Sequence, residues 1–443
     1  MKNIIKTIFD KINKKGSYDV EVFSRSKKRV RIFFEKNELK TLHEDEVEGI
    51  GVRVIKDGKL GFASTNVLND ESLEQIVNDA AVTSETGTKD IGNVLTSPST
   101  YSDIKGLYSE EMASFHLPEL MELARTFFRA AKDYDERISL DSANVELTVM
   151  EDEISNSLGL SAKKKKTMLS YLLFGMAIEG EDISSFDYRF GVSTDLKKIE
   201  EKLNSTATQF ASSVINALGA HPCKSFNGLA LLSPQVVAAL FGQSLSILLN
   251  GEHVLRKRSP FHNKLDEPVG NEKITVLDNP LVDNSPYSTA FDREGTPTKK
   301  LVLIENGVLK NFIHNNYSAK HLKCESTGHA SGDFSELPAI ELHNIEIPGQ
   351  KSLKEITKTI DQGVFINRFS GNVNPINGIV SGTVKGGWFV KSGQRKHPLT
   401  GVMMGTKVFE MFNNVVAVSN ETEQTFVGDL PYILVDGVSF TGE

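Results

Sequence analysis

Cysteine is nearly absent from this sequence of 443 residues, which contains only Cys223 and Cys324. A small domain held together by disulfides is therefore excluded, and so is a cysteine-rich zinc or iron–sulfur site built by this chain alone. The count leaves one long-range disulfide open, although reduced thiols are the simpler expectation.

Long hydrophobic runs are also missing. No stretch approaches the roughly 18 apolar residues that a membrane helix needs. Residues 1–15 place isoleucines and a phenylalanine at helical spacing, with lysines and Asp10 between them. They lack the unbroken apolar core of about 7–15 residues that marks a signal peptide. We therefore expect a soluble, cytoplasmic protein without membrane contact.

Positive charge is not in excess, because 50 Lys and Arg stand against 58 Asp and Glu, for a formal net charge of −8. A general nucleic-acid binder needs surplus cations to displace counterions from phosphates, so a nucleic-acid partner is not expected. The chain is long enough for two or three domains with hydrophobic cores of their own.

The first hundred residues carry strand and hairpin signals. Alternating apolar residues around Val20–Val22 and Val30–Phe34 are typical of half-buried strands. Asp57-Gly58 joins two further strand-like runs and predicts a tight hairpin, and Asn69 or Asp70 is placed to cap a following helix. Gly49 and Gly51 superficially suggest a dinucleotide loop, but the third glycine is missing and no helix follows directly.

The middle of the chain alternates helix and strand patterns. We predict helices over about 110–134 and 196–218, with strand-like segments at 145–150, 168–174 and 186–190 between them. Four consecutive lysines, 163–166, lie between two of these segments. They offer an anion or nucleic-acid contact, but a solvated hairpin tip is the better interpretation.

The last half of the sequence is dominated by turns. Ser233-Pro234 predicts the start of an apolar helix over 235–249. Beyond it Gly, Asn and Pro recur every 8–12 residues, which indicates many short antiparallel strands in a sandwich or partly closed barrel. The predicted class is α+β in three parts: an N-terminal hairpin-and-helix layer (1–100), a middle helix–strand section (101–220) and a C-terminal β-rich domain (221–443).

Five segments in order resemble the TldD/PmbA family, also called modulators of DNA gyrase. The likeness runs from about residue 18 to the C-terminus. It is carried by residues 51–66 (GVRVIKDGKLGFASTN), 250–254 (NGEHV) with 259–261 (SPF), 291–298 (FDREGTPT), 303–310 (LIENGVLK) and 326–330 (STGHA).

The resemblance implies that this chain belongs to the branch without metal. The catalytic branch carries His-Glu-x-x-x-His on a helix just before a Gly-Asp/Glu element, where the imidazoles bind zinc and the Glu acts as general base. The six positions counted back from Gly251 run from Gly242 and Gln243 to Ile247 and offer neither a metal ligand nor a carboxylate. The five-residue spacing of the two His needs a locally widened turn. The late cysteine of the zinc branch is absent too. We therefore expect a PmbA/TldE-like chain with no catalytic residue and no metal, whose partner carries the zinc.

Other candidate residues follow from the matched segments. Asp292, Glu294 and His329 are their best candidates for a substrate cleft, although Asp292–Glu294 equally suits a turn. His314, His321 and His329, spaced seven and eight apart, suggest a weak metal site or, more simply, ordinary polar histidines. Cys324 near His321 offers a nucleophile–base pair, but plain packing is the better interpretation.

Three functions remain open from the sequence. The leading one is a non-catalytic subunit of a two-component zinc metallopeptidase that acts on unfolded peptides or small proteins with a zinc-bearing TldD-like paralogue. The second is a stand-alone homodimeric peptidase with an unrecognised site around His329. The third is a regulatory or binding protein without hydrolysis. A homo- or heterodimer is expected in the first two cases, with its interface in the apolar C-terminal segments Val415–Val418 and Tyr432–Leu434.

Overall fold

The computed structural model describes residues 2–36 and 38–442 and is built on one long curved sheet. Seven strands pair antiparallel in the order β3-β2-β1-β4-β5-β6, with β7 also on β5. They are β1 (Asp19–Glu35), β2 (Glu38–Lys56), β3 (Lys59–Thr65), β4 (Ile138–Asn156), β5 (Ser161–Glu179), β6 (Asp182–Ile183) and β7 (Asp187–Ser193).

The predicted hairpin at Asp57-Gly58 is confirmed. Both residues have positive φ, 53° and 78°, and Lys56 pairs with Lys59 across the turn. Positive φ at both central residues is typical of the turns whose twist matches that of paired strands. The turn therefore fixes the register of β2 on β3.

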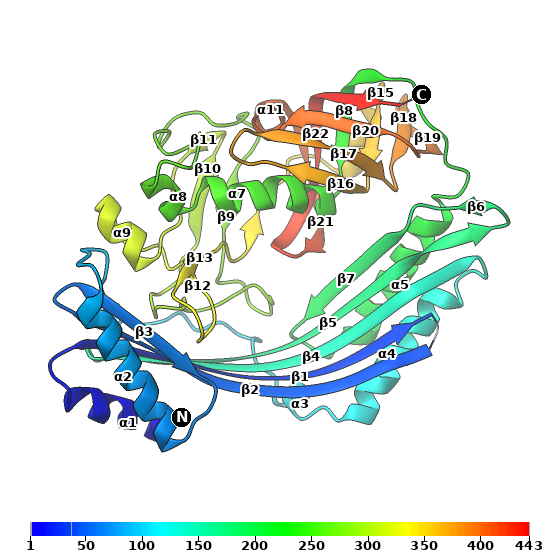
Figure 1. The fold of residues 1–443 in the computed structure, drawn as a ribbon. Coiled ribbons are helices and arrows are strands. Elements are labelled where there is room, and N and C mark those ends of the chain that lie inside the picture. Colours follow the sequence, from blue (N-terminus) through cyan, green and yellow to red (C-terminus); the bar gives the residue numbers. More distant parts are fainter. Residues whose placement is uncertain (1, 37, 443) are drawn as a thin grey trace.

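Two pairs of helices cover the convex face of this sheet (Figure 1). At one end α1 (Lys2–Asn13) and α2 (Asp70–Thr86) pack on β1 and β2, and Asn69 caps α2 through its side chain as predicted. At the other end α4 (Leu117–Lys132) and α5 (Ile199–Ile215) bury Phe127 and Phe210 against β4 and β5. Each pair removes one apolar face of the sheet from water.

The helix predicted over 110–134 is interrupted. The structure has a short helix α3 (Glu110–Ala113), a break at Ser114–His116, and then α4. Pro118 lies in the first turn of α4, where its missing N–H has no helical partner in any case. The sequence prediction missed this proline as a start signal.

The C-terminal region consists of three antiparallel or mixed sheets. Its largest sheet has the order β16-β17-β20-β22-β8-β15-β18-β19, with β21 on β22, and β15 pairs parallel with β8. Its strands are β8 (Phe226–Leu232), β15 (Gln362–Ile366), β16 (Arg368–Val373), β17 (Ile379–Lys385), β18 (Trp388–Lys391), β19 (Gln394–Pro398), β20 (Met403–Lys407), β21 (Val415–Thr425) and β22 (Gly428–Thr441).

Two smaller sheets and four short helices complete this region. The four-stranded sheet is β11-β10-β9-β14, and β12 pairs with β13. The bounds are β9 (Val276–Asp278), β10 (Leu301–Glu305), β11 (Val308–Leu309), β12 (Ala330–Ser331), β13 (Ala339–Ile340), β14 (Ile345–Glu346), α8 (Gly251–Leu255), α9 (Asn316–Leu322), α10 (Leu353–Lys358) and α11 (Val408–Asn413). The predicted α+β class with an antiparallel β-rich C-terminal region is confirmed.

One buried helix runs through the C-terminal core, close to the predicted span 235–249. It begins after the Ser233 cap as α6 (Pro234–Val237), widens into a π-helix at Ala238–Gly242, and continues as α7 (Gln243–Leu248). Phe241 in the widened turn is fully buried and stacks on Phe412 with ring centroids 4.4 Å apart.

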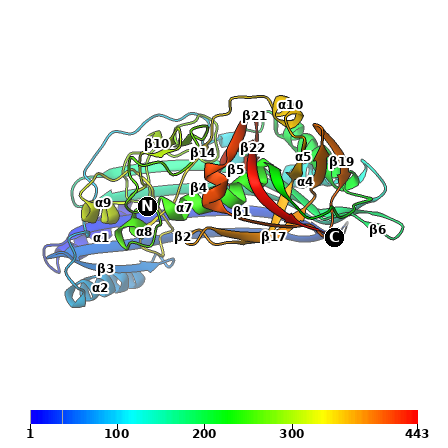
Figure 2. The same ribbon diagram turned by 90° about the horizontal axis from the view of Figure 1, so that it is seen from above.

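The C-terminal region lies over the concave face of the first sheet (Figure 1), and Figure 2 looks down on this arrangement. The first sheet contains strands from both sides of residue 100: β1 pairs with β4 along most of its length. The division of the chain at residues 100 and 220 stays a prediction. Among the described residues no helix is long and apolar enough to span a membrane.

The apolar segments expected at a dimer interface lie mostly inside the chain. Val415, Val418, Ile433 and Leu434 are at most 2% exposed. The first three pack in the core that contains the helix Pro234–Leu248, and Leu434 packs in a second cluster on Ile356 of α10. Placing an interface there was therefore wrong for these four side chains. The sequence could not show which distant helices pack on the two faces of this sheet.

Candidate functional site

A cleft of about 490 Å³ separates the first sheet from the C-terminal region. Its floor comes from β1, β4 and β5, and its roof from the loops before β10 and around β12 to β14. The polar residues that line it include Arg25, Asp152, Lys164, Lys166, Asp292, Arg293, Ser331 and His343.

Two further cavities adjoin the cleft in turn. A cavity of about 220 Å³ shares Tyr287 with the cleft, and another of about 460 Å³ shares Lys202, Gln424 and Asp429 with the second. Tyr287 donates a hydrogen bond to the Thr425 carbonyl at the junction. The three cavities thus form a broken groove with mixed polar walls.

Two of the four consecutive lysines point into the cleft, so the solvated hairpin tip was wrong for them. Lys164 Nζ donates to Thr289 Oγ1 at 2.9 Å and to the Phe291 carbonyl at 2.8 Å. Lys166 Nζ donates to the Pro286 carbonyl at 2.7 Å, and burial lowers the pKa of Lys166 to about 7. Lys163 and Lys165 remain exposed, as the alternation of a strand requires.

Asp152 pairs with two positively charged side chains in the cleft floor. Arg25 donates a hydrogen bond to each of its carboxylate oxygens, with Nε–Oδ1 at 2.7 Å and Nη2–Oδ2 at 3.0 Å. Lys164 Nζ lies 3.8 Å from Oδ2. Burial opposes the charge on Asp152, but the Arg25 hydrogen bonds and the positive charges of Lys164, Arg25 and Arg293 together outweigh it, so the pKa of Asp152 lies below its usual range.

Asp292 and Glu294 lie together in a buried turn, which was one of the two interpretations that the sequence allowed for them. Asp292 accepts backbone N–H bonds from Glu294, Thr296 and Ala330, each at 2.9 Å. Burial, together with the nearby charge of Glu294, raises the pKa of Asp292 to about 7. Asp292 lines the cleft, whereas Glu294 points away from it.

Glu294 belongs to a buried charge network that joins the two parts of the molecule. Arg53 bridges Glu294 at 2.9 Å and Glu21 at 2.6 Å, and Arg293 adds a bond to Glu21 at 3.3 Å. All four side chains are at most 9% exposed. Glu294 therefore forms an ion pair that holds its loop on the sheet, and it is not a cleft residue as the sequence suggested.

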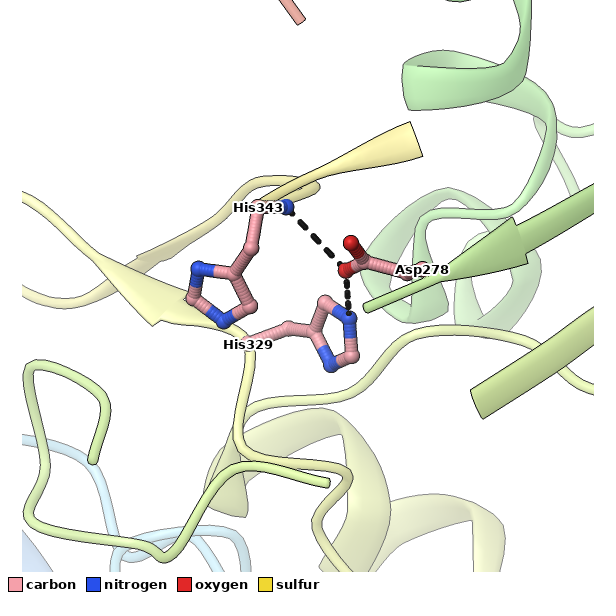
Figure 3. A group of neighbouring side chains, drawn as sticks. All are labelled: Asp278, His329 and His343. Atoms are coloured by element: carbon pink, nitrogen blue, oxygen red, sulfur yellow. Dashed lines mark hydrogen bonds and ion pairs between the residues drawn. The ribbon is translucent and has the colours of Figure 1, made fainter. Parts of the chain in front are cut away.

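His329 lies beside the cleft, in a cluster with two residues that the sequence analysis did not single out (Figure 3). Its Nε2 is 2.6 Å from Asp278 Oδ2, and both side chains are fully buried. The His343 ring is tilted by 32° against the His329 ring, with ring centroids 4.9 Å apart, and lines the cleft. Burial, reinforced by the charge of His329, lowers the pKa of His343 to about 4, so this imidazole is neutral.

Backbone groups orient the three side chains. Asp278 Oδ1 accepts the Asn344 N–H at 2.6 Å, and Oδ2 accepts the His343 N–H at 3.1 Å. His343 Nε2 lies 2.7 Å from the Gly328 carbonyl, and His329 Nδ1 lies 3.0 Å from the Thr327 carbonyl. Burial opposes the charge on Asp278, but the hydrogen bond and charge of His329 together with the Asn344 N–H outweigh it, so the pKa of Asp278 lies below its usual range.

The other candidate histidines do not join this cluster. His314 bonds Ser318 at 3.1 Å, and burial lowers its pKa to about 4. His321 pairs with Asp90 at 2.6 Å. The proposed triple site of His314, His321 and His329 is therefore not formed. Cys324 is exposed and its Sγ lies near the Ala319 carbonyl, and both cysteines are free, so neither the disulfide nor a Cys324–His321 pair is seen.

The positions aligned with the zinc motif do not fit a zinc ion. Gly242 has no side chain and is buried against Val427, Gln243 is exposed, and Ile247 is half-buried. None of the three offers a nitrogen, thiolate or carboxylate ligand. The π-helix Ala238–Gly242 ends at the first aligned position, and the following aligned positions lie in the α-helix Gln243–Leu248, so the aligned segment itself does not have the widened turn that the motif's spacing requires.

Two parts of the chain match models of known protein families. Residues 20–83 match the model of PmbA/TldA metallopeptidase domain 1, and residues 229–442 match that of the PmbA/TldA metallopeptidase C-terminal domain.

Three similar proteins illustrate the match. The metalloprotease PmbA homolog of Buchnera aphidicola is 24% identical, over 94% of this chain and 91% of its own. The metalloprotease TldD homolog of the same organism is 24% identical, over 84% of this chain and 79% of its own. The crystal structure of TldE from Thermococcus kodakarensis has a TM-score of 0.89 at 24% identity, covering 99% of this chain and all of that one, and shows the same fold.

Proposed function

The chain belongs to the PmbA/TldD family of metallopeptidases, and from that premise we propose that it is the subunit without a catalytic metal in a two-component zinc peptidase. The pair would act on unfolded peptides or small proteins. The zinc and the general base would come from a TldD-like paralogue, and this chain would help to enclose and position the peptide.

One observation carries the proposal: the chain belongs to a metallopeptidase family but lacks the zinc ligands at the positions aligned with the motif. These positions are Gly242, Gln243 and Ile247, on the buried helix from Pro234 to Leu248. None of them offers a side chain that binds zinc. A chain that keeps the family's fold without these ligands fits a subunit that relies on a partner for catalysis.

The groove beside the sheet supports a role in handling peptides. Its three cavities lead from the cleft over β4 and β5 to the cavity between β7, α5 and β21, and each shares lining residues with the next. The walls mix carboxylates, lysines and backbone groups, which suits a polar main chain better than an apolar small molecule. The family's occurrence as both a PmbA and a TldD homolog in Buchnera aphidicola is consistent with a paralogous partner.

The test is reconstitution. The full chain and a TldD-type paralogue bearing His-Glu-x-x-x-His are purified separately, then mixed. Light scattering and cleavage of an unfolded peptide are followed. We expect a heterodimer that cleaves the peptide, and no cleavage by this chain alone. Cleavage by this chain alone would overturn the proposal, as would a failure of the two proteins to associate at micromolar concentration.

A second candidate, a stand-alone homodimeric peptidase, is favoured by one observation. His329 lies with Asp278 and His343 at the wall of the cleft, which places a buried acid–base group beside a solvent-filled space. In that case the isolated chain cleaves the peptide, and His329→Gln abolishes the activity. If neither the chain nor the mixture cleaves, a binding or regulatory role remains.

A further inference from the structure

We propose that Asp278, His329 and His343 bind one divalent transition-metal ion of the zinc type, at a site separate from the lost zinc motif. The inference stands apart from the proposed function, because a partner can supply the catalytic zinc whether or not this cluster holds an ion. It also departs from the expectation of a metal-free chain, which was argued only from the motif positions and the late cysteine.

The three side chains offer a ligand set that suits zinc. One ligand atom from each of the three residues lies within 4.8 Å of the other two. Two imidazoles and one carboxylate are a common ligand set for zinc, which accepts three protein ligands and one water. Among the described residues this is the one group of three such side chains that close together.

Backbone groups already orient the ligands, as the outer contacts of metal sites do. The Thr327 carbonyl faces His329 Nδ1 at 3.0 Å, which orients the ring and leaves Nε2 toward Asp278. The Asn344 N–H holds the second oxygen of Asp278. Metal-binding histidines usually donate their other N–H to a carbonyl or carboxylate in this way.

Binding requires an exchange of protons for the ion. In the metal-free chain a proton joins His329 Nε2 to Asp278 Oδ2 at 2.6 Å, and His343 Nε2 donates to the Gly328 carbonyl. The ion takes the place of the first proton, which leaves to solvent. His343 Nε2 exchanges the Gly328 carbonyl for the ion, and its proton moves to Nδ1 of the same ring, so this imidazole stays neutral. Such proton release is general for metal sites.

The cleft provides the path of entry. Asp278 and His329 are fully buried, whereas His343 is half-buried and lines the cleft beside Glu341 and Asp292. An ion entering from the cleft meets His343 first. Because His343 lines the cleft, water has access to the site from that side.

The test uses the purified full chain after treatment with a chelator. Cobalt(II) is titrated as a spectroscopic probe and zinc content is measured after gel filtration. We expect a saturable visible spectrum of tetrahedral cobalt and close to one equivalent of zinc per chain. His343→Gln should abolish both, and because this side chain is half-buried its fold should survive, as checked by circular dichroism.

His321→Gln is the matched control, since it removes a histidine paired with an aspartate outside the cleft. It should bind as the wild type does. A wild-type chain that gives no saturable spectrum means that the cluster is a structural Asp–His pair only, and the proposal fails. It also fails if His343→Gln binds as tightly as the wild type. His329→Gln serves as a second variant, read in the same way if it folds.

Discussion

Replacing Arg53 by Met should lower the free energy of unfolding by about 3–5 kcal/mol, the usual result of leaving a buried charge without its partner. Arg53 is the shared cation between Glu21 and Glu294, at 2.6 and 2.9 Å. Burial opposes the charge on Arg53, but the two carboxylates outweigh it and keep its pKa above the ordinary value. The network is neutral in the native chain and carries one uncompensated negative charge in the variant.

The magnitude can be checked by a double-mutant cycle. Glu294→Gln alone leaves one positive charge in excess, whereas Arg53→Met with Glu294→Gln restores a neutral pair of Glu21 and Arg293. The double variant should therefore lose less stability than the two single variants together, with a coupling of roughly 0.5–3 kcal/mol. Methionine fills much of the volume of arginine, so a cavity contributes little.

The assay is equilibrium unfolding in urea, followed by far-UV circular dichroism and by intrinsic fluorescence. Because the network joins β1 and β2 to the loop before β10, separation of the two probes would show that the two parts of the molecule come apart first. An Arg53→Met variant that loses less than about 1 kcal/mol, as a surface pair would, refutes the reasoning. Strict additivity in the cycle refutes it as well.

Three further variants test local features. Gly51→Ala should cost about 1–3 kcal/mol by overpacking, because its Cβ would lie 2.2 Å from the Phe334 carbonyl oxygen; Gly405→Ala, with nothing within 4 Å, is the control, and equal melting temperatures would contradict the contact. Asn69→Ala should cost about 1 kcal/mol in urea unfolding by removing the cap of α2; an unchanged midpoint would mean that water replaces the cap. Lys166→Met should flatten the rise of stability between about pH 7 and pH 10, because the unfolded chain keeps a proton there that the buried lysine has lost; melting curves with the wild-type slope would contradict this.

Local features were predictable from the sequence because their causes are local. Asp57-Gly58 lies between two strand patterns, Asn69 precedes an apolar periodicity, and Ser233-Pro234 combines a cap with a proline at the first helical position. In each case the residues that determine the structure lie within a few positions of it. The same reasoning failed at Pro118, where a start signal stood inside an apparently continuous helix.

The site was less predictable because it depends on long-range packing. Lys164 and Lys166 are desolvated by a loop more than a hundred residues away, so their spacing alone indicated a solvated turn. His329 was identified from a matched segment, but Asp278 is 51 positions before it and His343 lies on a different loop.

The role of Gly49 and Gly51 also depends on long-range packing. Their spacing superficially suggested a dinucleotide loop, whereas the structure places both against Phe334 of the C-terminal region. A Cβ at Gly49 would lie 2.3 Å from the Phe334 ring. The glycines are needed for close approach of two distant segments, and a single sequence does not show which segment approaches.

The most direct test of the central claim asks which subunit carries the chemistry. This chain in its native form is assembled with a paralogue whose His-Glu-x-x-x-His glutamate is replaced by glutamine, and the rate of peptide cleavage is compared with that of the native pair. We predict an intact heterodimer without cleavage, because the catalytic zinc and its general base lie in the paralogue. Cleavage at the native rate by the pair with the disabled paralogue would contradict it, since this chain would then be the catalyst.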